Sequence, residues 1–173
     1  MTKDKFNELL HRIRNGDNSA LEPIYNEYHS SMQATANFIL HEEADAQDAA
    51  SEALLKLINY AKHRNSDECI ENPGGFMYVT VRSCALDILR KKKREEAAEL
   101  EEVCATNDFS DQTLYKYDLL KALSKLDETE RELAIRHFMF DENIKELNRD
   151  FDYHYNSLIR KLKEIRKKIN KFL

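Results

Sequence analysis

Residues 44–61 read ADAQDAASEALLKLINYA, and this stretch decides the fold class. At about 100° per residue, one side of a helix built from it collects small and apolar residues, namely Ala46, Ala50, Ala53 and Leu57. The opposite side collects Asp45, Asp48, Glu52, Leu55 and Asn59. We therefore expect a helix here, with its alanine stripe buried and its acidic side exposed.

Helical periodicity continues on both sides of this stretch. Upstream, an apolar stripe covers residues 6–13 and a second helical pattern covers residues 19–40. Downstream, residues 71–75 (ENPGG) form the strongest break, and a long helix over residues 76–94 ends in the basic run RKKKR. The chain of 173 residues holds three Gly and two Pro, too few for the turns of a hairpin-rich β protein. The sequence thus predicts an all-α fold.

Residues 95–114 differ in composition from the rest of the chain. They contain seven acidic residues and neither Lys nor Arg, and their helical periodicity is lost after Glu102. This composition is typical of a linker that is helical at its start and flexible later, although residues 95–102 could instead continue the preceding helix. We expect two small helical domains, residues 1–94 and 115–173, joined by this acidic linker.

The second of these domains carries the pattern of a helix-turn-helix. Asp127 is placed to cap one helix, and Asn143 with Glu146 three residues later fits a capping box that opens the next. After a turn over residues 151–154, apolar residues repeat at steps of four, three and four over 158–169. A short helix, a tight turn and a longer basic helix are the elements of a helix-turn-helix.

Three surfaces of the predicted helices carry candidate functional residues. The first is the acidic side of helix 44–61, where Leu55 is surrounded by carboxylates. Solvation alone explains an acidic helix face, and that interpretation stays open for the charges. A leucine in the middle of such a face is typical of a protein interface. We therefore expect the first surface to bind a protein partner.

The second surface belongs to helix 76–94. We expect its inward side to hold Tyr78, Val79, Ala85, Leu86 and Leu89. The outward side holds Thr80, Ser83, Arg90, Lys91 and Arg94, with Asp87 among them. Five consecutive cations at 90–94 favour phosphate binding, because each neutralised phosphate releases counterions. Cations also gather at helix C-termini for dipole reasons, but this requires only one or two of them.

The third surface is the exposed side of the last helix. Residues 156–173 contain seven Lys or Arg and one Glu. In a helix-turn-helix, the first turns of the second helix meet base edges and later cations meet phosphates. This assigns Asn156, Ser157, Arg160 and Lys161 to bases, and Lys167 and Lys168 to the DNA backbone. A solvated basic helix packed on its neighbours is the alternative.

The charge balance indicates how such patches would work. The chain carries 27 Lys and Arg against 32 Asp and Glu, a formal net charge of −5. An acidic chain with basic patches binds DNA poorly by itself, because its long-range field opposes approach. The charge therefore favours a subunit that acts together with a larger partner.

Other classes of protein are not indicated. The sequence has no zinc-binding, dinucleotide-binding or phosphate-loop motif and no catalytic constellation, so we expect no metal, no cofactor and no enzyme. Cys69, Cys84 and Cys104 are isolated and read as reduced thiols. No apolar run approaches a membrane span and the N-terminus is not a secretory signal, so we expect a cytoplasmic protein.

Four segments resemble bacterial RNA polymerase sigma factors of the extracytoplasmic-function type. Residues 10–21 (LHRIRNGDNSAL), with the tyrosines that follow, are similar to the opening segment of that family. Residues 45–57 (DAQDAASEALLKL) resemble its polymerase-binding helix, and residues 72–90 (NPGGFMYVTVRSCALDILR) resemble its promoter-melting segment. Residues 122–169 align without a gap to its helix-turn-helix, which reads the −35 element. Gly74-Gly75 stands where the family has a more helical pair, and we expect it to loosen the start of the melting helix.

The resemblance implies a function and partners. The protein would direct core RNA polymerase to promoters and assist melting, with contacts to the β′ clamp helices and the β flap. Asp48, Ser51, Glu52 and Leu55 would contact the clamp helices. Thr80, Ser83, Arg90, Lys91 and Arg94 would lie along the −10 element, and the residues of the third surface along the −35 element. An anti-sigma factor is a further candidate partner.

Two other functions remain open from the residues alone. The chain could be a homodimeric helix-turn-helix regulator that binds DNA without polymerase. It could also be a helical scaffold or adaptor without a DNA role. Co-elution with polymerase, or a dimer on a palindromic site, would separate the first two possibilities.

Overall fold

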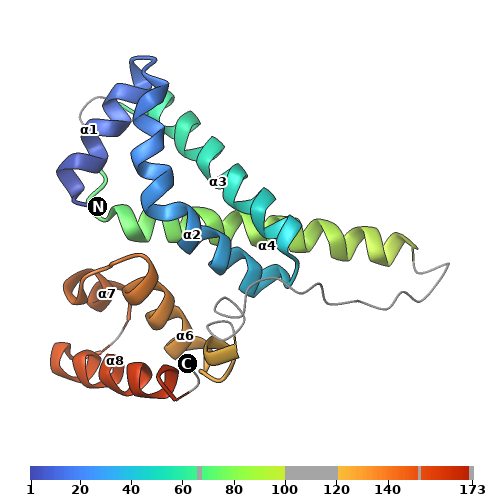
Figure 1. The fold of residues 1–173 in the computed structure, drawn as a ribbon, viewed down its shortest axis with the longest axis vertical. Helices are drawn as coiled ribbons and strands as arrows, with labels where there is room; N and C mark the ends of the chain where they lie inside the picture. The colour runs from blue at the N-terminus through green and yellow to red at the C-terminus, as the bar shows by residue number, and fades with distance from the viewer. Residues whose placement is uncertain (66–67, 100–120, 152, 172–173) are drawn as a thin grey trace.

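The computed structural model describes residues 1–65, 68–99, 121–151 and 153–171. Within these ranges the regular secondary structure is entirely helical, as predicted (Figure 1). The N-terminal helices are α1 (Lys3–Arg14), η1 (Asn18–Ala20), α2 (Leu21–Leu40), α3 (Glu43–His63) and α4 (Pro73–Glu99). The C-terminal helices are α6 (Glu128–Ala134), η2 (Ile135–Met139), α7 (Ile144–Asp150) and α8 (Tyr155–Ile169).

The N-terminal helices share one hydrophobic core. α2, α3 and α4 pack against one another, and α1 packs mainly on α3. Phe6 of α1 meets Tyr28 of α2 edge to face, with ring centroids 6.1 Å apart. The predicted alanine stripe of α3 is confirmed, since Ala46, Ala50, Ala53 and Leu57 are all fully buried. Such small side chains allow the neighbouring helices to approach α3 closely.

α4 is longer at both ends than the predicted helix over residues 76–94. It begins at Pro73, a favourable residue in the first helical turn, and the Asn72 side chain accepts a 2.9 Å hydrogen bond from the Gly75 amide. Gly74 and Gly75 therefore belong to the helix, whose start is capped. α4 runs to Glu99, so the first residues of the predicted linker continue the helix. Residues 100–114 of that linker lie outside the described residues.

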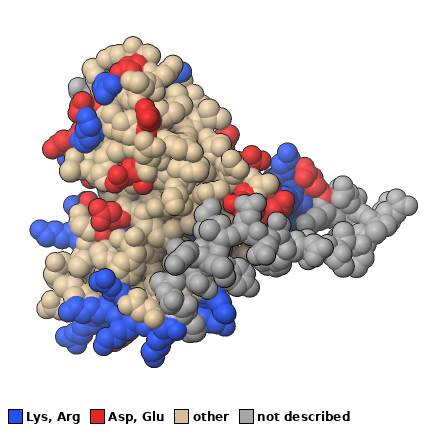
Figure 2. Space-filling view, viewed as in Figure 1, with Lys and Arg blue, Asp and Glu red and all other residues tan. Residues whose placement is uncertain are grey.

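α6 and α7 begin where their capping residues place them. The Asp127 side chain accepts a 2.7 Å hydrogen bond from the Glu130 amide, and Asn143 forms a complete capping box with Glu146. α8 buries the predicted stripe of Leu158, Leu162, Ile165 and Ile169. Figure 2 shows Lys and Arg gathered over the end of the molecule where α8 lies.

The two sets of helices touch through the turn that follows η2. Phe140 in this turn is 2 % exposed and lies between two tyrosines of the N-terminal helices. Its ring stacks on Tyr28 with centroids 6.3 Å apart and meets Tyr78 of α4 edge to face at 5.7 Å. Figure 1 shows the C-terminal helices below the N-terminal ones, and η2 packs against α4.

Candidate functional site

α3 presents a row of exposed residues opposite its alanines. The row, called the acidic stripe below, consists of Asp48, Ser51, Glu52 and Leu55, all exposed. Spacings of three and four residues place them on successive turns of one face. Leu55 keeps 54 % of its surface exposed despite being apolar. The structure thus brings together all the residues predicted to bind a protein partner, around an exposed leucine.

Asp45 follows the same face of α3 as the acidic stripe, but it is half-buried and not exposed. The reason is Lys92 of α4, whose Nζ contacts the Asp45 carboxylate and lies 2.5 Å from Glu42 Oε2. Hydrogen bonds with Asp45 and Glu42 raise the pKa of Lys92 above its ordinary value. Lys92, from the middle of the basic run, therefore joins α4 to the first turn of α3.

The core face of α4 differs from the predicted one at Val79. The buried residues of this helix include Met77, Tyr78, Val81, Cys84 and Ala85, which share one side. Tyr78 and Ala85 thus face inward as predicted, while Leu86 and Leu89 are half-buried. Val79 is 60 % exposed, because its helical position is nearly opposite the centre of the buried side.

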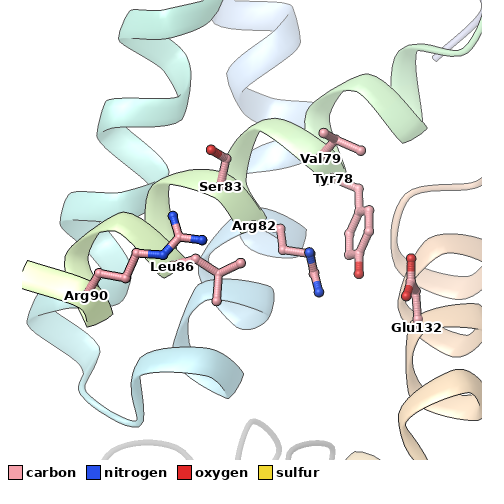
Figure 3. Close-up of a pocket in the computed structure, with 7 residues that line it drawn as sticks. All are labelled: Tyr78, Val79, Arg82, Ser83, Leu86, Arg90 and Glu132. Atoms are coloured by element: carbon pink, nitrogen blue, oxygen red, sulfur yellow. The ribbon is translucent and has the colours of Figure 1, made fainter. Parts of the chain in front are cut away.

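The exposed face of α4 forms one wall of a pocket of about 250 Å³, called the α4–α6 pocket below (Figure 3). The wall is made by Tyr78, Val79, Arg82, Ser83, Leu86 and Arg90, and Glu132 of α6 lies on the other side. The Tyr78 hydroxyl points toward Glu132 in Figure 3. Burial raises the pKa of Tyr78 to about 12, so its hydroxyl stays protonated and can donate a hydrogen bond.

Sequence reasoning missed Arg82, which lies in this pocket beside the predicted Ser83 and Arg90. Val79, Arg82, Leu86 and Arg90 follow one another at steps of three, four and four, which marks a helix face. This spacing was available in the sequence. The face is hard to recognise because Val79 and Leu86 are apolar and suggest core positions.

The other predicted −10 residues lie around this face with ordinary surface contacts. The Thr80 hydroxyl donates to the Phe76 carbonyl over 2.7 Å and is half-buried. Arg90 Nη1 lies 3.0 Å from Asp87 Oδ1, and Lys91 Nζ lies 3.8 Å from Glu95 Oε1. Exposed ion pairs contribute only about 0–1 kcal/mol, so phosphate can compete for these cations. Arg94 is exposed as well.

The predicted −35 residues share α8 but fall into two groups. Asn156, Ser157, Arg160 and Lys167 are exposed on the side away from the buried stripe. Lys161 and Lys168 instead reach Glu130 of α6, at distances of 2.7 Å and 2.5 Å from its Oε1. The two lysines therefore have a structural role that their sequence positions do not reveal.

Glu130 explains why two lysines gather there. Its side chain is only 2 % exposed. It lies in the first turn of α6, where the helix dipole favours an acidic residue. Burial by itself would raise the pKa of Glu130. Hydrogen bonds from Lys161 and Lys168 outweigh burial and lower the pKa to about 2. The carboxylate is thus charged, and its ion pairs fasten α8 to α6.

A second buried ion pair lies at the turn after η2. Arg136 is 5 % exposed and binds Glu142 with two hydrogen bonds, Nε to Oε1 at 2.8 Å and Nη2 to Oε2 at 2.9 Å. Arg136 also contacts Asp150 of α7. Burial opposes the arginine charge, but Glu142 and Asp150 overcome this effect and raise the pKa of Arg136. No sequence spacing marks this pair, because the chain turns between its members.

No family model matches the chain, and no curated protein matches it. Among the described residues, no helix has both the length and the apolar character needed to cross a membrane. The same part of the chain contains no group of three or more His, Cys, Asp or Glu side chains that could hold a metal ion.

Proposed function

We propose that the chain is a sigma-type subunit of bacterial RNA polymerase that guides the core enzyme to promoters and assists DNA melting. The proposal includes two domains joined by the acidic linker, with a helix-turn-helix formed by α7, residues 151–154 and α8. The observation that carries it is the acidic stripe of α3, where Leu55 is exposed among carboxylates. Residues 45–57 and 72–90, which resemble the polymerase-binding and promoter-melting segments of sigma factors, support it.

The charge distribution supports the same function. The acidic stripe would meet a basic surface of the polymerase, while the exposed cations of α4 and α8 would meet DNA phosphates. A net charge of −5 opposes DNA binding by the free chain, so a partner must supply further contacts. Melting requires no catalytic group, because capture of unstacked bases shifts the duplex equilibrium at a cost of about a few kcal/mol per base step.

The proposal is tested with the purified full chain and core RNA polymerase from the same source. Gel filtration should show a complex of one chain with one core enzyme. Run-off transcription from a randomised promoter library should then yield defined start sites only when the chain is present. A stable dimer that binds a palindromic site without polymerase would support a homodimeric regulator instead. If the chain neither binds polymerase nor changes its start sites, the proposal is wrong.

The acidic stripe gives the first prediction. Leu55→Ala should weaken polymerase binding by about ten-fold, since removal of a central apolar contact typically costs more than about 1 kcal/mol. Glu52→Lys should weaken it further by placing a cation against a basic surface. Neither change should shift the thermal unfolding midpoint, because both side chains are exposed. Affinity is measured by fluorescence titration, with Glu22→Lys as an exposed control outside the stripe. Unchanged affinity for both variants would remove this assignment.

The division of α8 into two groups gives the second prediction. Arg160→Ala should reduce promoter-dependent transcription by about ten-fold, because one good base contact contributes about 1–3 kcal/mol. It should leave the free energy of unfolding unchanged. Lys161→Ala should also lower the free energy of unfolding by about 1 kcal/mol, because Glu130 loses one of its charged donors. Run-off transcription and urea unfolding of both variants separate the two effects. Full transcription with Arg160→Ala would contradict the predicted DNA contact.

A further inference from the structure

The α4–α6 pocket contains a buried tyrosine whose hydroxyl lacks a partner. Tyr78 is only 4 % exposed, and among the described residues no group forms a hydrogen bond with its hydroxyl. The hydroxyl opens into the pocket and points toward Glu132 (Figure 3). A buried tyrosine hydroxyl usually has a hydrogen-bond partner. We therefore expect the partner of Tyr78 to be a molecule bound in the pocket.

Arg82 supplies a positive charge to the same pocket. It is exposed, and no ion pair or hydrogen bond joins its guanidinium to the rest of the described chain. By contrast, Arg90 farther along α4 lies 3.0 Å from Asp87. An arginine guanidinium binds a carboxylate or a phosphate through two parallel hydrogen bonds. Arg82 and the Tyr78 hydroxyl together can therefore bind one small anionic group.

Glu132 of α6 supplies the opposite charge across the pocket. Its carboxylate lies 3.6 Å from Arg136 Nη1, while Arg136 makes its two shorter hydrogen bonds with Glu142. A carboxylate accepts up to about four hydrogen bonds, so Glu132 can also accept from a ligand. Burial is the main cause of the raised pKa of Tyr78, and Glu132 raises this pKa further while Arg82 lowers it. Both charges therefore lie near the Tyr78 hydroxyl, where one molecule can meet all three groups.

The size and the apolar side chains of the pocket define the rest of the ligand. Val79 and Leu86 lie three residues before and four residues after Arg82, so the three share one helix face. Val79 is exposed and Leu86 is half-buried, so a ligand can cover apolar surface of both. The volume of about 250 Å³ exceeds the roughly 150 Å³ of a cavity that holds benzene and falls below the roughly 300–1,000 Å³ of drug-sized sites. These values favour a small molecule with a short apolar chain.

We propose that the α4–α6 pocket binds a free α-amino acid with an apolar side chain. The ligand carboxylate would contact Arg82 and the Tyr78 hydroxyl, and its ammonium would contact Glu132. Its side chain would cover Val79 and Leu86. A lone phosphate matches this site less well, because the Glu132 carboxylate repels it and it covers neither apolar side chain. The inference concerns the free chain and goes beyond the proposed role in transcription.

The ligand is tested by titration of the isotope-labelled full-length chain, with amide chemical shifts measured by NMR. L-Leucine should bind with a Kd of about 1 mM or below and should shift the amides of α4 and α6 around the pocket. Three analogues each remove one feature of leucine. Leucinamide lacks the carboxylate, N-acetylleucine lacks the ammonium and glycine lacks the apolar side chain. Each should bind at least about ten-fold more weakly than leucine, and so should inorganic phosphate.

Variants identify the residue that recognises each group of the ligand. Arg82→Gln should abolish the preference for leucine over leucinamide, and Glu132→Gln should abolish the preference for leucine over N-acetylleucine. Tyr78→Phe retains the ring, removes only the hydroxyl and should weaken leucine binding by about three-fold. Arg14→Gln and Glu128→Gln are matched controls at exposed positions outside the pocket, and both should bind leucine like the wild type. A general loss of structure would weaken binding of all ligands alike, so the loss of one preference indicates a direct contact.

Several results would overturn the inference. Unshifted α4 and α6 amides at about 10 mM leucine would show that the pocket takes no amino acid. Binding of the analogues as tight as that of leucine would exclude recognition of a zwitterion, and equally tight binding of phosphate would indicate a plain anion site. Unchanged preferences in Arg82→Gln and Glu132→Gln would place the binding elsewhere. If a variant loses helix content in circular dichroism, the analogue series on the wild type decides. These titrations contain no polymerase, so their failure leaves the sigma proposal untouched.

Discussion

Arg136→Ala is expected to lower the free energy of unfolding by about 3–5 kcal/mol. The arginine supplies two hydrogen bonds to Glu142, a carboxylate that is 1 % exposed. Without the arginine, that carboxylate stays buried with Asn72 as its remaining hydrogen-bond donor. An uncompensated buried charge costs far more than the ion pair itself contributes, and this asymmetry sets the size of the effect. Urea unfolding monitored by circular dichroism measures the loss.

Two further variants test whether the loss of stability in Arg136→Ala comes from the unpaired Glu142 carboxylate. Arg149→Ala removes an exposed arginine nearby on α7 and should change stability by no more than about 0.5 kcal/mol. The double variant Arg136→Met with Glu142→Gln removes both charges but keeps an acceptor for Asn72. It should be more stable than Arg136→Ala alone, because no unpaired charge remains. A loss below about 1 kcal/mol for Arg136→Ala would contradict the role of this pair.

Acidification is expected to weaken the attachment of α8 to α6 through Glu130. The folded-state pKa of about 2 lies below the ordinary value of 4.5, so the folded protein holds this carboxylate in its charged form. The resulting stabilisation is fully present above about pH 4.5 and is lost as the pH falls toward 2. At 1.36 kcal/mol per pKa unit, it amounts to about 3 kcal/mol.

Glu130→Gln isolates this contribution. The variant should be less stable than the wild type at neutral pH, because Lys161 and Lys168 lose their buried anionic partner. Its stability should fall less steeply between pH 5 and 2 than that of the wild type. Glu128→Gln, an exposed acid in the same helical turn, should retain the wild-type slope. Equal slopes for wild type and Glu130→Gln in urea unfolding at each pH would contradict the assignment.

The helical pattern of this chain was predictable because its signals are local. The alanine stripe of α3 follows the helical period, and it is buried where predicted. Asp127 and Asn143 mark helix starts because a side chain caps the amides two or three residues away. The exposed face of α3 follows from the same period once the buried face is known. These features depend on residues within a few turns of one another.

The errors arose where a second helix decides which side of the first is covered. Val79 is apolar and so predicts a core position, but the neighbours of α4 meet the helix on the opposite side. Asp45 follows the acidic face as predicted, but its pairing with Lys92 of α4 is not visible in the sequence. Lys161 and Lys168 look like free cations in a basic helix, and Glu130 of another helix binds them. Each case depends on residues far apart in the sequence.

The sequence by itself determined three features: the all-α class of the described residues, the main helix starts and the acidic stripe of α3. The reason is that hydrogen bonds within a helix link residues only a few positions apart. The tertiary structure alone decided how the C-terminal helices meet α4. Gly74, Phe140 and Glu142 are separated by long stretches of chain, and no local preference announces their contact. Close packing of two preformed helical surfaces brings them together, because the fit depends on the shape of both surfaces at once.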